Sequence, residues 1–476
     1  MTHSSFRSHL ISKLPGVVCT LFAVQPWLDC LSFWSNSSWT LALRLTLLAL
    51  TTGTGFFLSS RKRAYYRLAG ICLFLGLGHL WAVCMCGAQD LFTDTANFVR
   101  VLQLPCTALA LITCLEAQPR CYGALKSGMA ISLGSILFIT LLSNLTGTEP
   151  HTYEDGSGIL GWFSNTNSQS AILSMTVPVA VLWASQQKGW KHPLFWFLCL
   201  GGLSALYLLG TRLACFALLA TGVGLSFFLL RERRREGAVL IAACLLFTAL
   251  LPWSPMVEHQ KQYYAVQYDR QAQINSSLSA YDLPSLEEPG LTEAELAARQ
   301  ALWVEALTPI YTFYVPDFVE LFGAEETIAI CDYSADIGVM TELRPKKLKF
   351  AQLLMDGSPA SAKVFGLELS RFTVGENNYD VENDFHGIYY LYGAAGLAAM
   401  LLFLGYFLAR LMRSLRNQGW TFLTADTVAW SIALGCCLLH CYFTAGVLRR
   451  PNAAFYLSAC LAAVYQLTNK CPPSVQ

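Results

Sequence analysis

Charged residues are scarce in this sequence: Asp, Glu, Lys and Arg make up 13% of its 476 residues, whereas hydrophobic residues make up 54%. Soluble domains carry about 25% charged residues, so a soluble globule of this composition would lack polar surface. The 32 basic and 31 acidic residues nearly cancel, which excludes a generally basic nucleic-acid-binding protein. The composition therefore predicts a protein of the lipid bilayer without a nucleic-acid partner.

Patterns for disulfides and metal sites are also missing. Most of the 17 cysteines lie in apolar runs, where cysteine acts as a small hydrophobic residue. Cys331 is the only cysteine in the long polar segment, and one cysteine cannot form a disulfide framework by itself. No C-x-x-C pair with matching Cys or His partners occurs, so we expect no structural zinc site.

Apolar runs of roughly the 20 residues that cross a bilayer recur along the chain. Backbone groups inside lipid have no outside partners, so each run must be a helix. The predicted fold class is an all-α polytopic membrane protein, with helices one to nine in residues 1–253, a large segment at 254–385 and helices ten to twelve in 386–476. The twelve predicted spans are 14–34, 39–59, 67–87, 97–118, 125–146, 169–186, 194–211, 213–230, 237–253, 386–409, 424–445 and 452–468.

Basic residues in the short connections predict the orientation, because they favour the cytoplasmic side. With the N-terminus inside, the inner connections hold 18 Lys and Arg residues and the short outer connections hold three. Both termini are then cytoplasmic, and the segment 254–385 is extracytoplasmic. That segment contains 21 acidic and nine basic residues.

The large segment is predicted to be partly helical. Thr292 and Glu295 have the spacing of a capping box before apolar residues at helical intervals, so a helix is predicted over 291–307. A second helix is predicted over 346–357, ending at Gly357. The aromatic stretch between them, 308–345, is predicted to be irregular.

Four charged residues are predicted at the depth of the outer headgroups: Asp29, Arg44, Arg100 and Arg212. The stretch 194–230 leaves no room for a loop between two crossings, so Gly-Thr-Arg at 210–212 forms the tip of a hairpin. Ionisable side chains at membrane depth indicate a functional site unless they are paired. For Arg44 and Arg100, contact with lipid phosphates or a structural pair with Asp29 is the alternative.

Two polar stretches are predicted on the same outer side. Tyr153, Asn165 and Asn167 precede or begin the span at 169–186, where amides can bind hydroxyl-rich ligands or cap the helix. Asp384 and His386 precede the span at 386–409, where a carboxylate near an imidazole can provide a general base. Alternatively, the acidic group only favours the helix dipole.

This pattern resembles the bacterial O-antigen ligase family and the related polysaccharide polymerases. The shared features are the number of spans, the large segment after the ninth span, GWFSNTN before the sixth span, Thr-Arg at the hairpin and DFHGIYYLYGAAG at the start of the tenth span. QPWLD at 25–29 and ENDFHGIYYLYGAAG are similar to the divergent members of Gram-positive bacteria. The resemblance implies a glycosyltransferase of the C-type membrane architecture in the bacterial plasma membrane. Its donor would be a glycan on undecaprenyl pyrophosphate, and its acceptor a glycan or another cell-envelope molecule at the outer face. No metal or other cofactor is implied.

The resemblance also implies roles for individual residues. Arg212 matches the family's arginine at the hairpin, and Arg344 or Arg371 corresponds to a second arginine that holds pyrophosphate. His386 lies near the family's catalytic histidine, and Asp384 is the alternative for that role. Ligase and polymerase remain alternatives, as does a transporter or flippase, which also needs many spans and charge within the membrane. A non-enzymatic sensor or scaffold is the third hypothesis.

Overall fold

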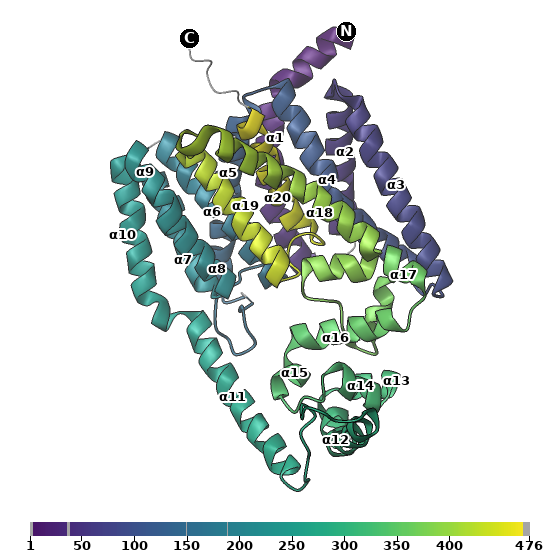
Figure 1. The fold of residues 1–476 in the computed structure, drawn as a ribbon. Coiled ribbons are helices and arrows are strands. Elements are labelled where there is room, and N and C mark those ends of the chain that lie inside the picture. The colour runs from purple at the N-terminus through teal and green to yellow at the C-terminus, as the bar shows by residue number, and fades with distance from the viewer. Residues whose placement is uncertain (1–2, 36–38, 149, 188, 470–476) are drawn as a thin grey trace. The chain divides into compact units, whose positions relative to one another are not determined.

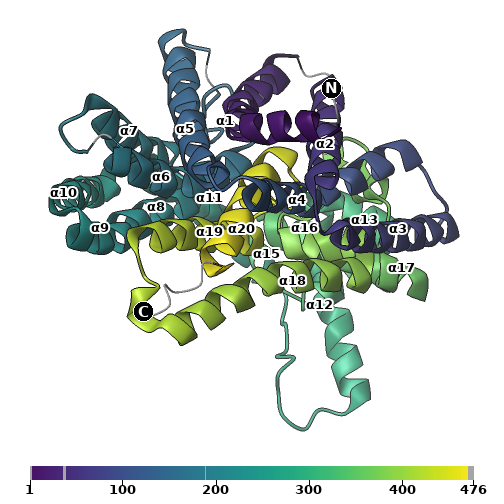
Figure 2. The same cartoon turned by 90° about the horizontal axis from the view of Figure 1, so that it is seen from above.

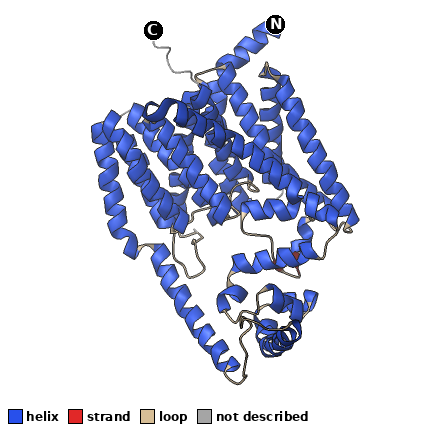
Figure 3. Cartoon of the chain, viewed as in Figure 1, coloured by secondary structure: helices blue, strands red, loops and turns tan. Residues whose placement is uncertain are grey.

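Helices make up nearly all the regular structure of the chain, as the computed structural model shows (Figure 3). The structure describes residues 3–35, 39–148, 150–187 and 189–469. Within them the only strands are β1 (Thr373–Val374) and β2 (Asn377–Asn378), which pair antiparallel. Two of the 18 basic residues that the sequence places in the inner connections, Lys188 and Lys470, lie outside the described residues.

Most helices follow one another with short connections, and the longest connections are 146–165 and 279–292 (Figure 1). Those before residue 254 are α1 (His3–Ser35), α2 (Trp39–Leu58), α3 (Lys62–Met85), α4 (Leu91–Ala117), α5 (Cys121–Leu145), α6 (Thr166–Gln187), α7 (Pro193–Leu209), α8 (Arg212–Leu219), the π-helix η1 (Ala220–Leu225), α9 (Ser226–Glu232), α10 (Arg234–Leu250) and η2 (Leu251–Trp253). Those after it are α11 (Pro255–Leu278), α12 (Glu293–Tyr314), α13 (Pro316–Phe322), α14 (Ala324–Ile330), α15 (Ile337–Thr341), α16 (Leu343–Asp356), α17 (Ala360–Phe365), η3 (Leu369–Phe372), α18 (Asp384–Gln418), η4 (Gly419–Thr421), α19 (Ala425–Phe443) and α20 (Pro451–Asn469).

Ten helices in the described ranges are long and apolar enough to cross a bilayer. The shorter apolar helix α7 covers the seventh predicted span, and α20 covers the twelfth. Every predicted span therefore coincides with helix. The prediction of an all-α polytopic membrane protein is confirmed.

The chain forms two compact units, which are described separately. Unit 1 comprises residues 1–76, 96–259 and 397–476, and unit 2 comprises residues 77–95 and 260–396. In unit 1, α6 contacts α5, α7, α19 and α20, an arrangement seen from above in Figure 2. Its side chains are buried without interruption from Ser168 to Leu182, as expected of a helix surrounded by other helices.

Unit 2 has an aromatic core. The rings of Phe350 and Tyr379 stack with centroids 4.3 Å apart, and Phe318 packs against both. The predicted capping box is confirmed: Thr292 and Glu295 each accept from the other's backbone N–H at the start of α12. The predicted helix at 346–357 is confirmed by α16.

The prediction of an irregular stretch over 308–345 is wrong. This stretch holds the end of α12 together with α13, α14 and α15. Pro316 begins α13, and Gly323 separates α13 from α14 with a φ of 87°. Because α13, α14 and α15 are only five to seven residues long, no long apolar period is visible in the sequence.

The helix α18 breaks at Gly393, whose φ is 68°. A Cβ atom there would collide with the backbone of Val364, and a Cβ on Gly366 would collide with that of Leu391. The backbone N–H of Leu367 donates to the carbonyl of Tyr390 over 2.9 Å. Gly366 and Gly393 have no side chains, and the segment around Gly366 can therefore cross α18 with the two backbones in direct contact.

Candidate functional site

The hairpin between α7 and α8 has the tight geometry that the sequence predicts. Gly210 ends α7 in the left-handed conformation, with a φ of 70°, which favours glycine. Thr211 caps α8, since its hydroxyl accepts from the N–H of Ala214 over 3.1 Å. Arg212 is the first residue of α8. The guanidinium group is therefore carried at a helix N-terminus, where the helix dipole adds positive potential.

Buried polar side chains support this hairpin from α6 and α19. The hydroxyl of Ser170 lies 2.7 Å from that of Thr211. Nε2 of His440 lies 3.4 Å from Ser170 Oγ and 3.3 Å from Ser174 Oγ. His440, Ser170 and Ser174 are all buried. A chain of hydrogen bonds therefore runs from α19 through α6 to the cap of the helix that carries Arg212.

A second support comes from the loop before α6. The Tyr153 hydroxyl donates to the Gly210 carbonyl over 2.9 Å. The Tyr153 ring stacks on the imidazole of His259 with centroids 3.7 Å apart. Nδ1 of His259 lies 2.7 Å from Asp155 Oδ2. The residues Tyr153, His259 and Asp155 thus connect the loop, α11 and the hairpin.

The Asp155 carboxyl in this support has a lowered pKa. Burial alone would raise its pKa, but hydrogen bonds from Ser157 and His259 outweigh burial and lower the pKa to about 2. The backbone N–H of Ser157 donates to Asp155 Oδ1 over 2.8 Å. The carboxylate is therefore ionised at neutral pH and holds the imidazole through Nδ1.

Arg212 itself is exposed. It makes no hydrogen bond or ion pair with any residue that the structure describes. The backbone of the hairpin, in contrast, is held by Ser170 through Thr211 and by Tyr153 through Gly210. An exposed guanidinium on a rigid hairpin is suited to bind an anionic group from outside the chain, because its planar fork matches the oxygens of phosphate.

Asn165 and Asn167 lie at the N-terminus of α6. Asn165 Oδ1 accepts from the N–H of Ser168 over 2.8 Å, so the predicted capping role is confirmed for this residue. Asn167 lies in the first turn of α6, and its backbone leaves no room for a Cβ at Gly446. Here the loop after α19 lies directly against α6.

Of the other predicted arginines in unit 1, Arg44 forms a buried ion pair. Its guanidinium lies 2.6 Å from Asp29 Oδ1 and donates to Gln25 Oε1 over 3.3 Å. This is the pair that the sequence offers as the alternative to a binding role. Arg100 lies in α4 and is partly buried.

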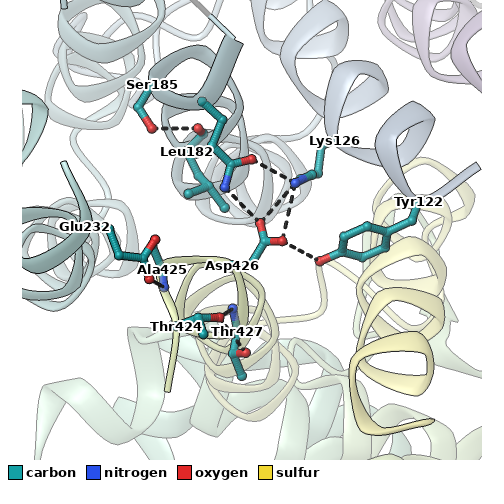
Figure 4. A network of polar contacts seen from close by, with 10 residues as sticks. Tyr122, Lys126, Leu182, Ser185, Glu232, Thr424, Ala425, Asp426 and Thr427 are labelled. Atoms are coloured by element: carbon teal, nitrogen blue, oxygen red, sulfur yellow. Dashed lines mark hydrogen bonds and ion pairs between the residues drawn. The ribbon is translucent and has the colours of Figure 1, made fainter. Parts of the chain in front are cut away.

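A second polar network joins the start of α5, the end of α6 and the start of α19 (Figure 4). Lys126 Nζ lies 3.1 Å from Asp426 Oδ1 and 2.8 Å from Gln186 Oε1, and Tyr122 donates to Asp426 over 3.4 Å. From Ser170 to Gln186, α6 rises about 24 Å at 1.5 Å per residue. Both ends of α6 are thus held by polar side chains.

Unit 2 contains the remaining predicted site residues. Asp384 is buried at the start of α18, and His386 is exposed in its first turn. Asn383 Oδ1 accepts from the His386 N–H over 3.0 Å. Arg344 is exposed and lies 3.9 Å from Glu382, which Lys347 approaches more closely, at 2.8 Å. Arg371 donates to the carbonyls of Cys86 and Gly87.

Unit 2 also contains buried polar contacts that the sequence does not reveal. His79 Nε2 lies 2.7 Å from Asp94 Oδ2, and Nδ1 lies 2.9 Å from the Phe365 carbonyl. Glu368 is buried and accepts from the N–H groups of Gln89 and Asp90. Together with Arg371, Glu368 binds the turn between α3 and α4 to the segment after α17.

The sequence interpretation did not include His440, His259 or Asp155. A single histidine inside an otherwise apolar span is a signal for His440. For His259 and Asp155 the sequence has no such signal, because 104 positions separate them.

Comparison with known families agrees with this architecture. No curated protein matches the chain significantly. The family described as O-antigen ligase like membrane protein matches residues 15–467, nearly the whole chain. The chain therefore belongs to the O-antigen ligase-like family of membrane proteins, and this membership supports a membrane enzyme that transfers a glycan from a lipid-linked substrate.

Proposed function

We propose that the protein transfers a glycan from an undecaprenyl-pyrophosphate carrier to an acceptor hydroxyl at the outer membrane face. Arg212 is proposed to bind the donor's diphosphate. The observation that carries this proposal is the exposed Arg212, without a partner among the described residues, on a hairpin fixed by Thr211 and Tyr153. The resemblance of its Thr-Arg pair to the family's hairpin motif supports the same role.

The chemistry of the transfer explains why an arginine is needed. The acceptor oxygen attacks the anomeric carbon, the bond from that carbon to the diphosphate oxygen breaks, and the diphosphate leaves with the electron pair. Negative charge therefore grows on the leaving group. A guanidinium carried on a fixed backbone stabilises that charge, and contacts of this kind contribute about 2–4 kcal/mol to catalysis. The acceptor's proton passes to a general base.

For the base, His386 and Asp384 are our candidates, because an imidazole or a carboxylate can accept the proton of the acceptor hydroxyl. Arg344 and Arg371 are the candidates for a second arginine on the diphosphate. Arg371 already binds two backbone carbonyls, whereas Arg344 is exposed near Glu382. Of the two, Arg344 therefore has more freedom to bind a substrate. Arg100, Asn167 and Tyr153 are proposed as further contacts to donor or acceptor.

A reconstitution tests the function. Purified protein in proteoliposomes is incubated with a synthetic polyprenyl-pyrophosphate oligosaccharide and a glycan acceptor. We expect equal amounts of free polyprenyl pyrophosphate and extended acceptor. Movement of the intact donor between leaflets, without any release of the carrier, would instead establish a flippase. One direct displacement also predicts inversion at the anomeric carbon, so retention in the product's NMR spectrum would contradict this mechanism.

A further inference from the structure

A hollow of about 480 Å³ lies where α9 and α10 meet η4 in unit 1. It is far along α8 and α9 from the Arg212 hairpin, since α9 ends at Glu232. Its wall combines rings, an aliphatic side chain and two guanidinium groups. The lining residues are Phe227, Phe228, Leu230, Arg231, Arg234 and Trp420.

The two arginines of this hollow differ from the neighbouring arginines. Arg231 and Arg234 are exposed and make no hydrogen bond or ion pair with any described residue. Arg233, in contrast, donates to the Ser185 carbonyl over 2.9 Å, and Arg235 lies over the Trp190 ring at 5.4 Å. The guanidinium groups that line the hollow are thus those that the chain leaves available.

Neither of the two nearby carboxylates forms an ion pair with Arg231 or Arg234. Glu232 accepts from the backbone N–H of Ala425 over 2.9 Å, and Glu236 accepts from that of Trp190 over 3.1 Å. Arg234 is also the first residue of α10, where the helix dipole favours an anion. The charge of the hollow is therefore complementary to an anionic group supplied from outside the chain.

The rest of the wall requires an apolar partner. Phe227 is 63% exposed and Trp420 is 71% exposed. Aromatic side chains of this kind concentrate at the membrane interface, with their rings against acyl chains. A small anion would satisfy the arginines but would leave both rings uncovered. A molecule with an anionic head and a hydrocarbon tail matches both parts of the hollow.

We propose that this hollow binds one anionic phospholipid, with its phosphate on Arg231 and Arg234 and its acyl chain against Phe227 and Trp420. Basic pockets between membrane helices are known to bind anionic headgroups in this way. Under the orientation that the basic residues predict, the lipid belongs to the cytoplasmic leaflet. The site is separate from the proposed donor site and does not depend on the transfer reaction.

Lipid binding to the full-length protein tests the proposal. The protein is purified in a neutral detergent and titrated with phosphatidylglycerol, phosphatidylcholine or inorganic phosphate, and bound lipid is counted by native mass spectrometry. We expect one tightly bound phosphatidylglycerol, weak binding of phosphatidylcholine and no competition by inorganic phosphate. Displacement of the lipid by millimolar phosphate would overturn the proposal, because it would show a site for small anions.

Variants locate the site. Arg231→Gln/Arg234→Gln should weaken phosphatidylglycerol binding by about thirtyfold. This loss combines two similar contributions to the lipid affinity, one from each arginine. Arg63→Gln/Arg67→Gln is the matched control, because it removes two exposed arginines of α3 outside the hollow. Trp420→Ala tests the apolar wall and should weaken binding while both arginines remain. Equal affinity in the wild type and the first double variant would refute the site.

Discussion

Ser170 and Thr211 share a hydrogen bond of 2.7 Å between their hydroxyl groups. Through it, the buried centre of the helix bundle is joined to the cap of the helix that begins with Arg212. His440 extends the connection to α19. A long and flexible side chain gains precision when its backbone cannot move. We therefore expect the position of Arg212 to depend on side chains that never touch a substrate.

Substitution of Thr211 tests this dependence. Thr211→Val keeps the shape but loses the cap on Ala214 and the bond to Ser170. We expect a loss of about 0.5–2 kcal/mol of stability, the usual cost of an N-cap, and slower glycan transfer. Thr211→Ser keeps both bonds and should resemble the wild type. Thermal unfolding in detergent and release of the carrier measure the two effects, and equal values for the Val and Ser variants would contradict the proposed support.

The buried pair of Arg44 and Asp29 makes a different prediction. Arg44→Met leaves the Asp29 carboxylate buried without its partner, which costs about 3–5 kcal/mol. The double variant Arg44→Met/Asp29→Leu removes both charges and should regain most of that stability. If the pair is structural, glycan transfer recovers in the double variant as well. A stable double variant that remains inactive would instead show that Arg44 binds the substrate.

The break in α18 can be tested with two glycines of one helix. Gly393→Ala forces a side chain into a left-handed conformation against the backbone of Val364. We expect a destabilisation greater than the ~1 kcal/mol of an ordinary glycine replacement. Gly405→Ala is the control, because its added methyl group has no atom within 4 Å apart from the adjoining backbone of its own helix. Thermal unfolding compares the two, and a neutral Gly393→Ala would argue against the observed crossing.

The lowered pKa of Asp155 predicts a dependence on acid. Its usual pKa is 3.8, and the folded protein lowers it to about 2. Because the folded value lies below the unfolded one, the contribution to stability is fully present above pH 3.8 and is lost as the pH falls towards 2. The difference in melting temperature between the wild type and Asp155→Asn should therefore be constant near neutrality and shrink in acid. A difference that grows on acidification would contradict this assignment.

Much of the architecture can be predicted from hydropathy, because a bilayer requires apolar helices of a set length. The length of the stretch 194–230 likewise predicts the hairpin at 210–212, because two crossings leave no room for a loop. Local signals are also informative, since Thr292 and Glu295 predict the start of α12. The capping box depends on two residues within one helical turn of each other. Gly323 shows the limit, since it ends a helix of only seven residues that has no visible period.

The contacts around the candidate site are harder to predict from the sequence. His259 and Asp155 are brought together by the fold across 104 positions, and His440 and Ser170 across 270. Neither pair has a spacing that indicates a contact. The pairing of Arg44 with Asp29 was open to prediction as one of two alternatives, because both lie near the same ends of neighbouring spans. Hydropathy places residues at a depth, and only packing decides which of them meet.

The most direct test of the account compares the wild type with Arg212→Lys in the release of polyprenyl pyrophosphate from a synthetic donor. Lysine keeps the charge but loses the two-pronged contact to phosphate oxygens. We predict that release slows by about a hundredfold or more while the melting temperature is unchanged. Release by Arg212→Lys at the wild-type rate would contradict the proposal that Arg212 holds the donor diphosphate.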